Sequence, residues 1–208
     1  MKDPVESYFQ ELHHILQEIV TTNHDCVPVR FNTGVNHIIG IIQDLSYRGN
    51  KLMFVGNGAS ASISSHQAVD FSKRAGIRAM AFNDASLLTC LSNDFGYPDV
   101  FAKSITLHAD PGDLLVAISS SGQSENILNA VDAARESNCQ VVTLSGINSS
   151  NPLRSMGDMN FYVPSPFYGH IEIAHLTILH SMVDILIQQK QHKQSQTKIN
   201  RTKQESIT

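Results

Sequence analysis

The chain has 208 residues, a formal net charge of −4 and a charged fraction of 16%. A domain usually takes roughly 100–200 residues, so we expect one hydrophobic core. The lysines and arginines are scattered and form no basic stripe, which argues against direct nucleic-acid binding. The longest apolar stretches, such as residues 38–42, are far shorter than the roughly 20 residues that cross a bilayer, so we expect no membrane span.

The amino terminus mixes charged and apolar residues and lacks the pattern of a signal peptide, so we expect a cytoplasmic protein. The three cysteines, Cys26, Cys90 and Cys139, are far apart and show no metal-ligand spacing. We interpret them as buried or idle thiols.

Two segments precede any strand pattern. Residues 5–20 and residues 33–47 carry apolar side chains at spacings of three and four, which predicts a helix in each. We expect these helices to form an added layer that is useful for packing or for the assembly of subunits.

Short apolar runs then alternate with helical patterns, one of which covers residues 60–74. This alternation predicts a doubly wound α/β domain with a five-stranded parallel sheet and right-handed crossovers. The expected strands are residues 51–55, 77–82, 114–118, 141–144 and 161–163.

A last long helix begins near residue 170 and keeps an apolar stripe as far as residue 186. From residue 190 onward the sequence is polar and almost free of large apolar groups, so burial cannot offset the entropy of ordering it. We therefore expect one domain over residues 1–189 and a disordered polar tail over residues 190–208.

Two loops carry the pattern of an anion site, Gly56-Asn-Gly-Ala-Ser60 and Ser119-Ser-Ser-Gly-Gln-Ser124. Each lies between an expected strand and an expected helix, where ligands bind in doubly wound sheets. Glycines let backbone N–H groups approach an anion, and serine hydroxyls add further donors. A turn with a helix N-cap is the alternative interpretation of either loop. We expect the serine loop to bind phosphate.

Histidines and carboxylates recur at helical spacing. His66 and Asp70 are four apart, which brings both side chains onto one helix face. On the last helix, Glu172 and His180 are eight apart, and His175 lies between them. Histidines on helices are commonly packing or surface residues, and the pairing with carboxylates on two helices is what favours a functional interpretation here.

Four strings resemble the phosphoheptose isomerase family of the sugar isomerase (SIS) domain superfamily: GNGAS, LTCLSNDFGYPDVFAK, GDLLVAISSSGQSENILNAVDAA and IEIAHLTILH. The resemblance covers about residues 5–188. It implies the flavodoxin-like SIS fold and a homotetramer with active sites between subunits. It also implies conversion of sedoheptulose 7-phosphate into D-glycero-D-manno-heptose 7-phosphate for surface lipopolysaccharide.

The same resemblance implies the site residues. His66, Asp70, Glu172 and His180 would form the catalytic and zinc-binding group, with Asp70 and His180 as the acid and base, and Glu172 would also contact the substrate. The remaining residues would hold the phosphate and the sugar: Asn57, Gly58, Ala59, Ser60, Asn93, Asp94, Ser119, Ser120, Ser121 and Ser124.

The chain departs from the family pattern at four places. The family has Glu where Asp70 stands, Gln where Glu172 stands, an Asp-Arg pair at Gly169-His170, and Gly-Gly at Gly58-Ala59. A carboxylate binds a cation more tightly than a neutral amide does, so we expect a stronger dependence on zinc than in relatives with Gln.

Two questions stay open at this stage. Asp70 is either the base that moves the substrate proton or a zinc ligand. The alternatives to the heptose isomerase are an isomerase of another sugar phosphate and a non-enzymatic binding protein. The latter would resemble the replication-initiator-associating protein, which lacks the histidine that matches His180.

Overall fold

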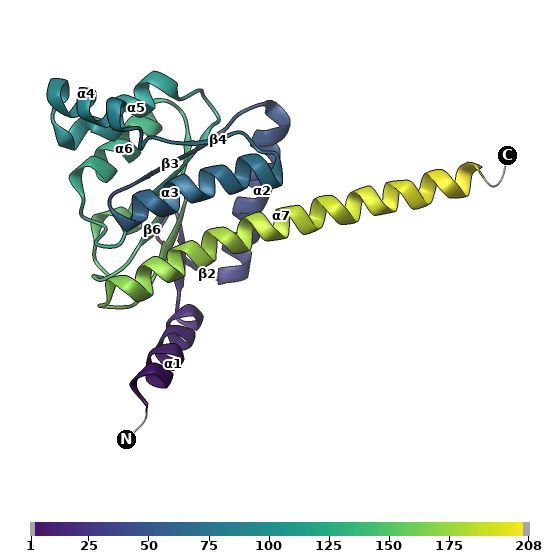
Figure 1. Cartoon of the computed structure of the whole chain (residues 1–208), viewed down its shortest axis with the longest axis horizontal. Coiled ribbons are helices and arrows are strands. Elements are labelled where there is room, and N and C mark those ends of the chain that lie inside the picture. The colour runs from purple at the N-terminus through teal and green to yellow at the C-terminus, as the bar shows by residue number, and fades with distance from the viewer. Residues whose placement is uncertain (1–2, 206–208) are drawn as a thin grey trace.

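The computed structural model describes residues 3–205, and a mixed sheet of seven strands lies at its centre (Figure 1). The order across the sheet is β2 (Pro28–Val29), β1 (Val20–Asn23), β7 (Met159–Tyr162), β6 (Gln140–Ser145), β5 (Leu114–Ser119), β3 (Leu52–Gly56) and β4 (Ala79–Ala81). The strands from β7 to β4 pair in parallel, whereas β1 is antiparallel to both β7 and β2.

The expected α/β fold is confirmed, and the expected number of strands is wrong. The parallel part contains the five strands that the sequence predicts, but β1 and β2 extend it at one edge. The helix expected over residues 5–20 includes Val20, whereas that residue begins β1 and pairs with Tyr162. In the parallel part the strand order reverses between β3 and β5, which is where doubly wound sheets bind ligands.

Helices cover both faces of the sheet. One face packs against α2 (Phe31–Arg48), α3 (Ala59–Asp70) and α7 (Tyr168–Glu205), and the other packs against α4 (Ala85–Phe95), α5 (Val100–His108) and α6 (Glu125–Glu136). Successive residues of a strand point to opposite faces. In β3, Phe54 accordingly joins the first core, whereas Met53 and Val55 join the second. This arrangement places the amino termini of α3 and α6 at the carboxyl edge of the sheet.

Three short helical segments complete the chain: η1 (Phe71–Ala75), a π-helical continuation of α3, and the 3-10 helices η2 (Tyr97–Asp99) and η3 (Pro152–Ser155). The first helix, α1 (Pro4–Gln17), ends before the predicted boundary at residue 20, and none of its residues is buried. Figure 1 shows it projecting away from the body of the domain.

The last helix, α7, extends far beyond the domain (Figure 1). The expected boundary at residue 189 has no counterpart in the secondary structure, because α7 continues as a helix to Glu205. That residues 190–208 are disordered stays a prediction. Over Tyr168–His192 this helix is also long and apolar enough to cross a membrane, but half of that window is buried inside the protein. The core helix of a soluble protein passes the same test, and the apolar residues of α7, such as Ile178 and Met182, belong to the core.

Candidate functional site

A cavity of about 280 Å³ opens at the carboxyl ends of β3 and β5, where the strand order reverses. Both loops that the sequence analysis singled out line it, together with the start of α7. Its lining residues are Asn57, Gly58, Ala59, Ser60, Ile118, Ser119, Ser120, Ser121, Ser124, Tyr168 and Glu172. We call this cavity the serine-loop pocket. Tyr168 was missed from the sequence, where an exposed tyrosine before a helix carries no distinctive signal.

The serine hydroxyls in the pocket are held in one group. The Oγ atom of Ser119 lies 3.4 Å from that of Ser121 and 3.3 Å from that of Ser124. The Ser119 hydroxyl also accepts a hydrogen bond from the backbone N–H of Gly122. The buried hydroxyl of Ser120 has no hydrogen-bond partner among the described residues. A buried polar group without a partner is costly, so a ligand in this pocket would gain a ready donor.

Glycines shape both loops. A side chain at Gly56 would lie 2.6 Å from the backbone of Ser60, so only glycine lets the strand and the helix approach so closely. Gly58 precedes α3 with a φ of +54° and has open space where a side chain would point. The first N–H groups of a helix have no partner within the helix and attract anions. The pocket therefore offers backbone and hydroxyl donors and no cationic side chain among its lining residues.

A small amide network fixes the first loop. The side-chain amides of Asn57 and Asn126 exchange two hydrogen bonds of 2.8 and 3.0 Å, and Tyr97 donates from its hydroxyl to Asn57 across 2.9 Å. Asn126 and Tyr97 were not predicted. Both residues contact Asn57 from positions that lie far from it in the sequence, so no local pattern indicated them.

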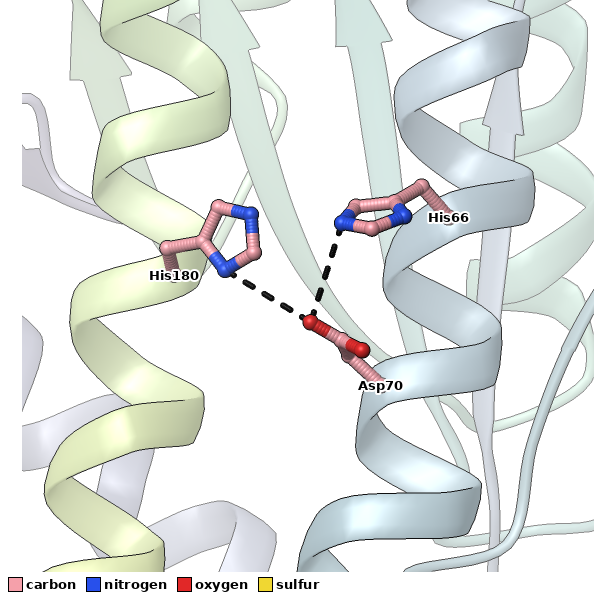
Figure 2. A group of neighbouring side chains, drawn as sticks. All are labelled: His66, Asp70 and His180. Carbon is pink, nitrogen blue, oxygen red and sulfur yellow. Dashed lines mark ion pairs between the residues drawn. The ribbon is translucent and has the colours of Figure 1, made fainter.

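A second group of polar side chains lies between α3 and α7. His66 and Asp70 extend from α3 and His180 extends from α7, and all three point toward one another (Figure 2). The Oδ2 atom of Asp70 lies 3.7 Å from Nε2 of His66 and 3.6 Å from Nδ1 of His180. Asp70 is only 13% exposed, whereas the two histidines are more open to solvent. We call these residues the His–Asp–His cluster.

Arg74 approaches the cluster from η1. It donates to Asp70 across 3.1 Å and to Asp184 of α7 across 2.7 Å. This arginine follows Asp70 at the same four-residue spacing that relates His66 to Asp70, so a signal for it was present in the sequence. The two ion pairs connect the end of α3 to α7.

Glu172 does not join the cluster, which corrects the four-residue group expected from the sequence. The metal-competent set contains His66, Asp70 and His180, whose ligand atoms all lie within 4.8 Å of one another. Eight residues advance a helix by about 12 Å, so Glu172 and His180 lie at different heights along α7. Glu172 instead lines the serine-loop pocket.

Asn93 and Asp94 lie on the exposed last turn of α4 and do not line the pocket. The Asn93 amide donates to Asp94 across 2.9 Å. The structure thus brings together eight of the expected substrate-binding residues with Glu172 and leaves this pair outside. A substrate contact by the pair stays a prediction.

His170 belongs to the Gly169-His170 pair at which the chain departs from the family pattern. His170 is buried against the ring of Tyr8 from α1, with the ring centroids 4.5 Å apart, and neither ring nitrogen has a hydrogen-bond partner among the described residues. His175 of α7 is fully buried, with Nε2 3.1 Å from the carbonyl oxygen of Ser145. Burial lowers the pKa of His175 to about 4, so this side chain is neutral at physiological pH.

The chain is similar to known proteins over most of its length. The model of the SIS domain family matches residues 7–146, which include both loops and the His66–Asp70 pair but not α7. A phosphoheptose isomerase of Geobacter sp. (strain M21) is 32% identical over 158 residues, covering 73% of this chain and 82% of the relative.

Two solved structures extend the likeness to α7. A phosphoheptose isomerase from Neisseria gonorrhoeae has a TM-score of 0.76 and 28% identity, with 88% of this chain and 97% of that one covered. A phosphoheptose isomerase from Francisella tularensis has a TM-score of 0.77 and 27% identity, with 90% of this chain and 100% of that one covered.

Proposed function

The chain belongs to the SIS domain family and, within it, to the phosphoheptose isomerases, and on this premise we propose that it converts sedoheptulose 7-phosphate into D-glycero-D-manno-heptose 7-phosphate. The observation that carries the proposal is the pairing of two separate features. A pocket of neutral donors suits a phosphate, and a carboxylate faced by two imidazoles suits proton transfer. A non-enzymatic binding protein has no need of the second feature and is not favoured.

The serine-loop pocket would hold the phosphate end of the substrate. Hydroxyl and backbone donors bind the phosphate without taking part in the reaction, and they fix the direction in which the sugar extends. The sugar carbons would then extend toward α7, which lines the pocket at Tyr168 and Glu172.

The His–Asp–His cluster would carry the chemistry. Isomerisation requires removal of a proton from one sugar carbon, stabilisation of an enediolate, and return of a proton to the neighbouring carbon. Asp70 is the first candidate for the base, with His180 as the second group. Oδ2 of Asp70 lies 3.7 Å from the His66 imidazole and 3.6 Å from the His180 imidazole, so the candidate base and the second group face the same space between α3 and α7.

The same residues fit a zinc ion. With zinc–ligand bonds of about 2.0–2.2 Å, two ligands of a tetrahedral site lie roughly 3.4 Å apart, and the two N···O distances of 3.6 and 3.7 Å in the cluster are close to this. Two imidazoles and one carboxylate leave a position open for substrate, as catalytic zinc sites do. When bound, zinc would act as a Lewis acid on the sugar oxygens. Asp70 then serves either as ligand or as base.

We also propose a homotetramer in the cytoplasm that supplies lipopolysaccharide synthesis, with active sites shared between subunits. The first helix supports assembly, because Val5 is 65% exposed and Phe9 is 64% exposed on an α1 that buries no residue. Light scattering that gives a monomer of 22.9 kDa at micromolar concentration would contradict the tetramer.

The function is tested by proton NMR of the zinc-loaded protein with sedoheptulose 7-phosphate, alongside ketose phosphates of five and six carbons. We expect the aldose 7-phosphate to form, and we expect Asp70→Asn and His180→Gln to abolish its formation while the melting temperature stays within a few degrees. Turnover of a shorter sugar phosphate alone would replace the substrate, and no turnover of any sugar phosphate would overturn the proposal.

A further inference from the structure

The side-chain amide of Asn57 has a fully occupied carbonyl group and one N–H bond that is not occupied. Its Oδ1 atom accepts from Nδ2 of Asn126 across 3.0 Å and from the hydroxyl of Tyr97 across 2.9 Å. Its Nδ2 atom donates to Oδ1 of Asn126 across 2.8 Å. Because an amide has two lone pairs on oxygen and two N–H bonds, one N–H of Asn57 has no partner among the described residues, whereas both lone pairs have one.

Both partners of Asn57 are fixed by the same helix, α6. Asn126 lies on this helix and is only 3% exposed. One turn later, Asn129 donates to the backbone carbonyl of Pro98 across 3.0 Å and so attaches η2 to α6. Tyr97 is the first residue of η2, and its side chain is 55% exposed. The Tyr97 hydroxyl therefore has a defined position, although its ring contributes little to the core.

The orientation of this amide decides what the serine-loop pocket offers at Asn57, which is one of its lining residues. The amide can give a ligand a hydrogen bond but cannot accept one. A doubly ionised phosphate monoester has only acceptor oxygens, whereas the singly ionised form carries one O–H that needs an acceptor. The two forms interconvert at about pH 6. Since an unmatched polar group is costly once it leaves water, this position favours the doubly ionised form.

We propose that Tyr97 is a positioning residue that makes the Asn57 amide a pure donor and thereby favours doubly ionised phosphate in the serine-loop pocket. Tyr97 does not itself line the pocket and acts through Asn57. Without its hydroxyl, one lone pair of the Asn57 carbonyl is free. That lone pair opposes a phosphate dianion and accepts a hydrogen bond from a protonated phosphate. The inference rests on the proposed sugar-phosphate function.

The test compares wild type and Tyr97→Phe at two pH values. Isothermal titration calorimetry measures the Kd of sorbitol 6-phosphate, a polyol phosphate without a carbonyl group to isomerise, for full-length protein of equal metal content. We expect Tyr97→Phe to raise the Kd about fivefold at pH 7.5, where the phosphate is doubly ionised, and less than twofold at pH 5.5, where most of it carries a proton. All acidic and imidazole groups, including Glu172 in the pocket and Asp99 beside Tyr97, are the same in both proteins and cancel from this ratio.

A double-variant cycle tests whether Tyr97 acts through Asn57. In an Asn57→Ala background the amide is absent, so Tyr97→Phe should change the Kd by less than a factor of about 1.5 at either pH. The matched control is Tyr47→Phe, which removes the same hydroxyl from a 92% exposed tyrosine of α2 outside the pocket and should bind as the wild type does. A hydroxyl with only a structural role would change the melting temperature and not the dependence of the ratio on pH.

Three results would overturn the proposal. They are a ratio of Kd values that is the same at pH 7.5 and pH 5.5, an effect of Tyr97→Phe that persists in Asn57→Ala, and a wild type that does not bind sorbitol 6-phosphate. Failure of the wild type to isomerise a heptose phosphate, with the predicted ratios observed, would contradict the proposed function and leave the role of Tyr97 in phosphate binding intact.

Discussion

Arg74 and Asp70 lie one helical turn apart, and Nη1 of Arg74 donates to the same Oδ2 atom of Asp70 that faces His66 and His180. Asp184 accepts a second hydrogen bond from the same guanidinium. The arginine lies on η1, a π-helical segment, and such segments are frequent at functional sites. Its geometry makes it a positioning residue that fixes the direction of the Asp70 carboxylate.

Replacement of Arg74 by Gln should therefore impair the chemical step more than substrate binding. We expect kcat to fall roughly tenfold or more, which equals about 1.4 kcal/mol of activation free energy, while KM changes little. Arg74 does not line the serine-loop pocket, so the phosphate contacts stay intact. Steady-state kinetics separate the two parameters.

Arg48→Gln is the control for this variant, because Arg48 forms an i,i+4 pair with Asp44 in which both side chains are exposed. Exposed pairs of this kind contribute little to stability. Equal kcat values in Arg74→Gln and Arg48→Gln would show that Arg74 does not position Asp70.

Simultaneous replacement of Ser119, Ser121 and Ser124 by Ala should remove most phosphate affinity. These hydroxyls form the concentrated neutral donor group of the pocket. We expect KM for the sugar phosphate to rise at least tenfold with a melting temperature within a few degrees of the wild type. Ser155→Ala, which removes a hydroxyl from η3 outside the pocket, should leave KM unchanged. Unchanged KM in the triple variant would contradict the phosphate assignment.

The strands of the parallel sheet could be predicted because each is a short apolar run that ends at a glycine or a polar loop. The expected strand at residues 114–118 corresponds to β5, Leu114–Ser119, and the expected strand at residues 51–55 corresponds to β3, Leu52–Gly56. Both loops of the pocket followed from their place after these strands, because the carboxyl ends of parallel strands meet at one edge of a sheet.

The antiparallel edge could not be predicted in the same way. The strand β1 has four residues and begins at Val20, which continues the helical pattern before it, and β2 has only two residues, Pro28 and Val29. β1 is stabilised by pairing with the distant strand β7, and β2 pairs with β1; the contact between β1 and β7 has no local signature in the sequence.

The observed site differs from the expected one in the positions of two residues along α7. Helical spacing placed Glu172 and His180 near one face, but two turns of rise put Glu172 in the pocket and His180 in the cluster. Which of them faces the Asp70 carboxylate depends on the axial register in which α7 packs against α3. The spacing of residues within one helix does not determine that register.

Gly122 should tolerate no side chain, for two reasons that can be separated. Its φ is +65°, which disfavours any L residue, and an added Cβ would lie 1.9 Å from Oδ1 of Asn151. Gly49 shares the first property with a φ of +82° but has open space around it. We expect Gly49→Ala to lower the free energy of unfolding by about 1 kcal/mol and Gly122→Ala to lower it by at least about 3 kcal/mol.

Urea unfolding measures both glycine variants. Gly122→Ala should also weaken sugar-phosphate binding, because the N–H of Gly122 donates to the hydroxyl of Ser119 in the serine loop. Equal losses in the two variants would mean that the contact with Asn151 relaxes without cost and that backbone strain alone decides the effect.

His175 should make the stability of the protein depend on pH in mildly acidic solution. Burial lowers its pKa from 6.5 to about 4, and the hydrogen bond with Ser145 only partly opposes this shift. Between these two values the unfolded chain binds a proton that the native protein does not, so acid favours unfolding. The stability linked to His175 is therefore fully present above about pH 6.5 and falls as the pH decreases toward 4.

The expected loss for this one group is about 2 kcal/mol between pH 7 and pH 5, measured as the free energy of unfolding in urea at each pH. His175→Asn keeps a side-chain N–H that can donate to Ser145 and removes the titrating ring. We expect this variant to be less stable at pH 7, because it leaves a void, but to lose about 2 kcal/mol less than the wild type on acidification.

The control is His24→Asn, since His24 is exposed and forms only an exposed pair with Asp25. It should retain the pH dependence of the wild type, because His175 is unchanged in this variant and the His24 side chain is 68% exposed. An identical loss of stability in His175→Asn and the wild type would mean that His175 accepts its proton in the native protein near pH 6.5, against the burial that the structure shows.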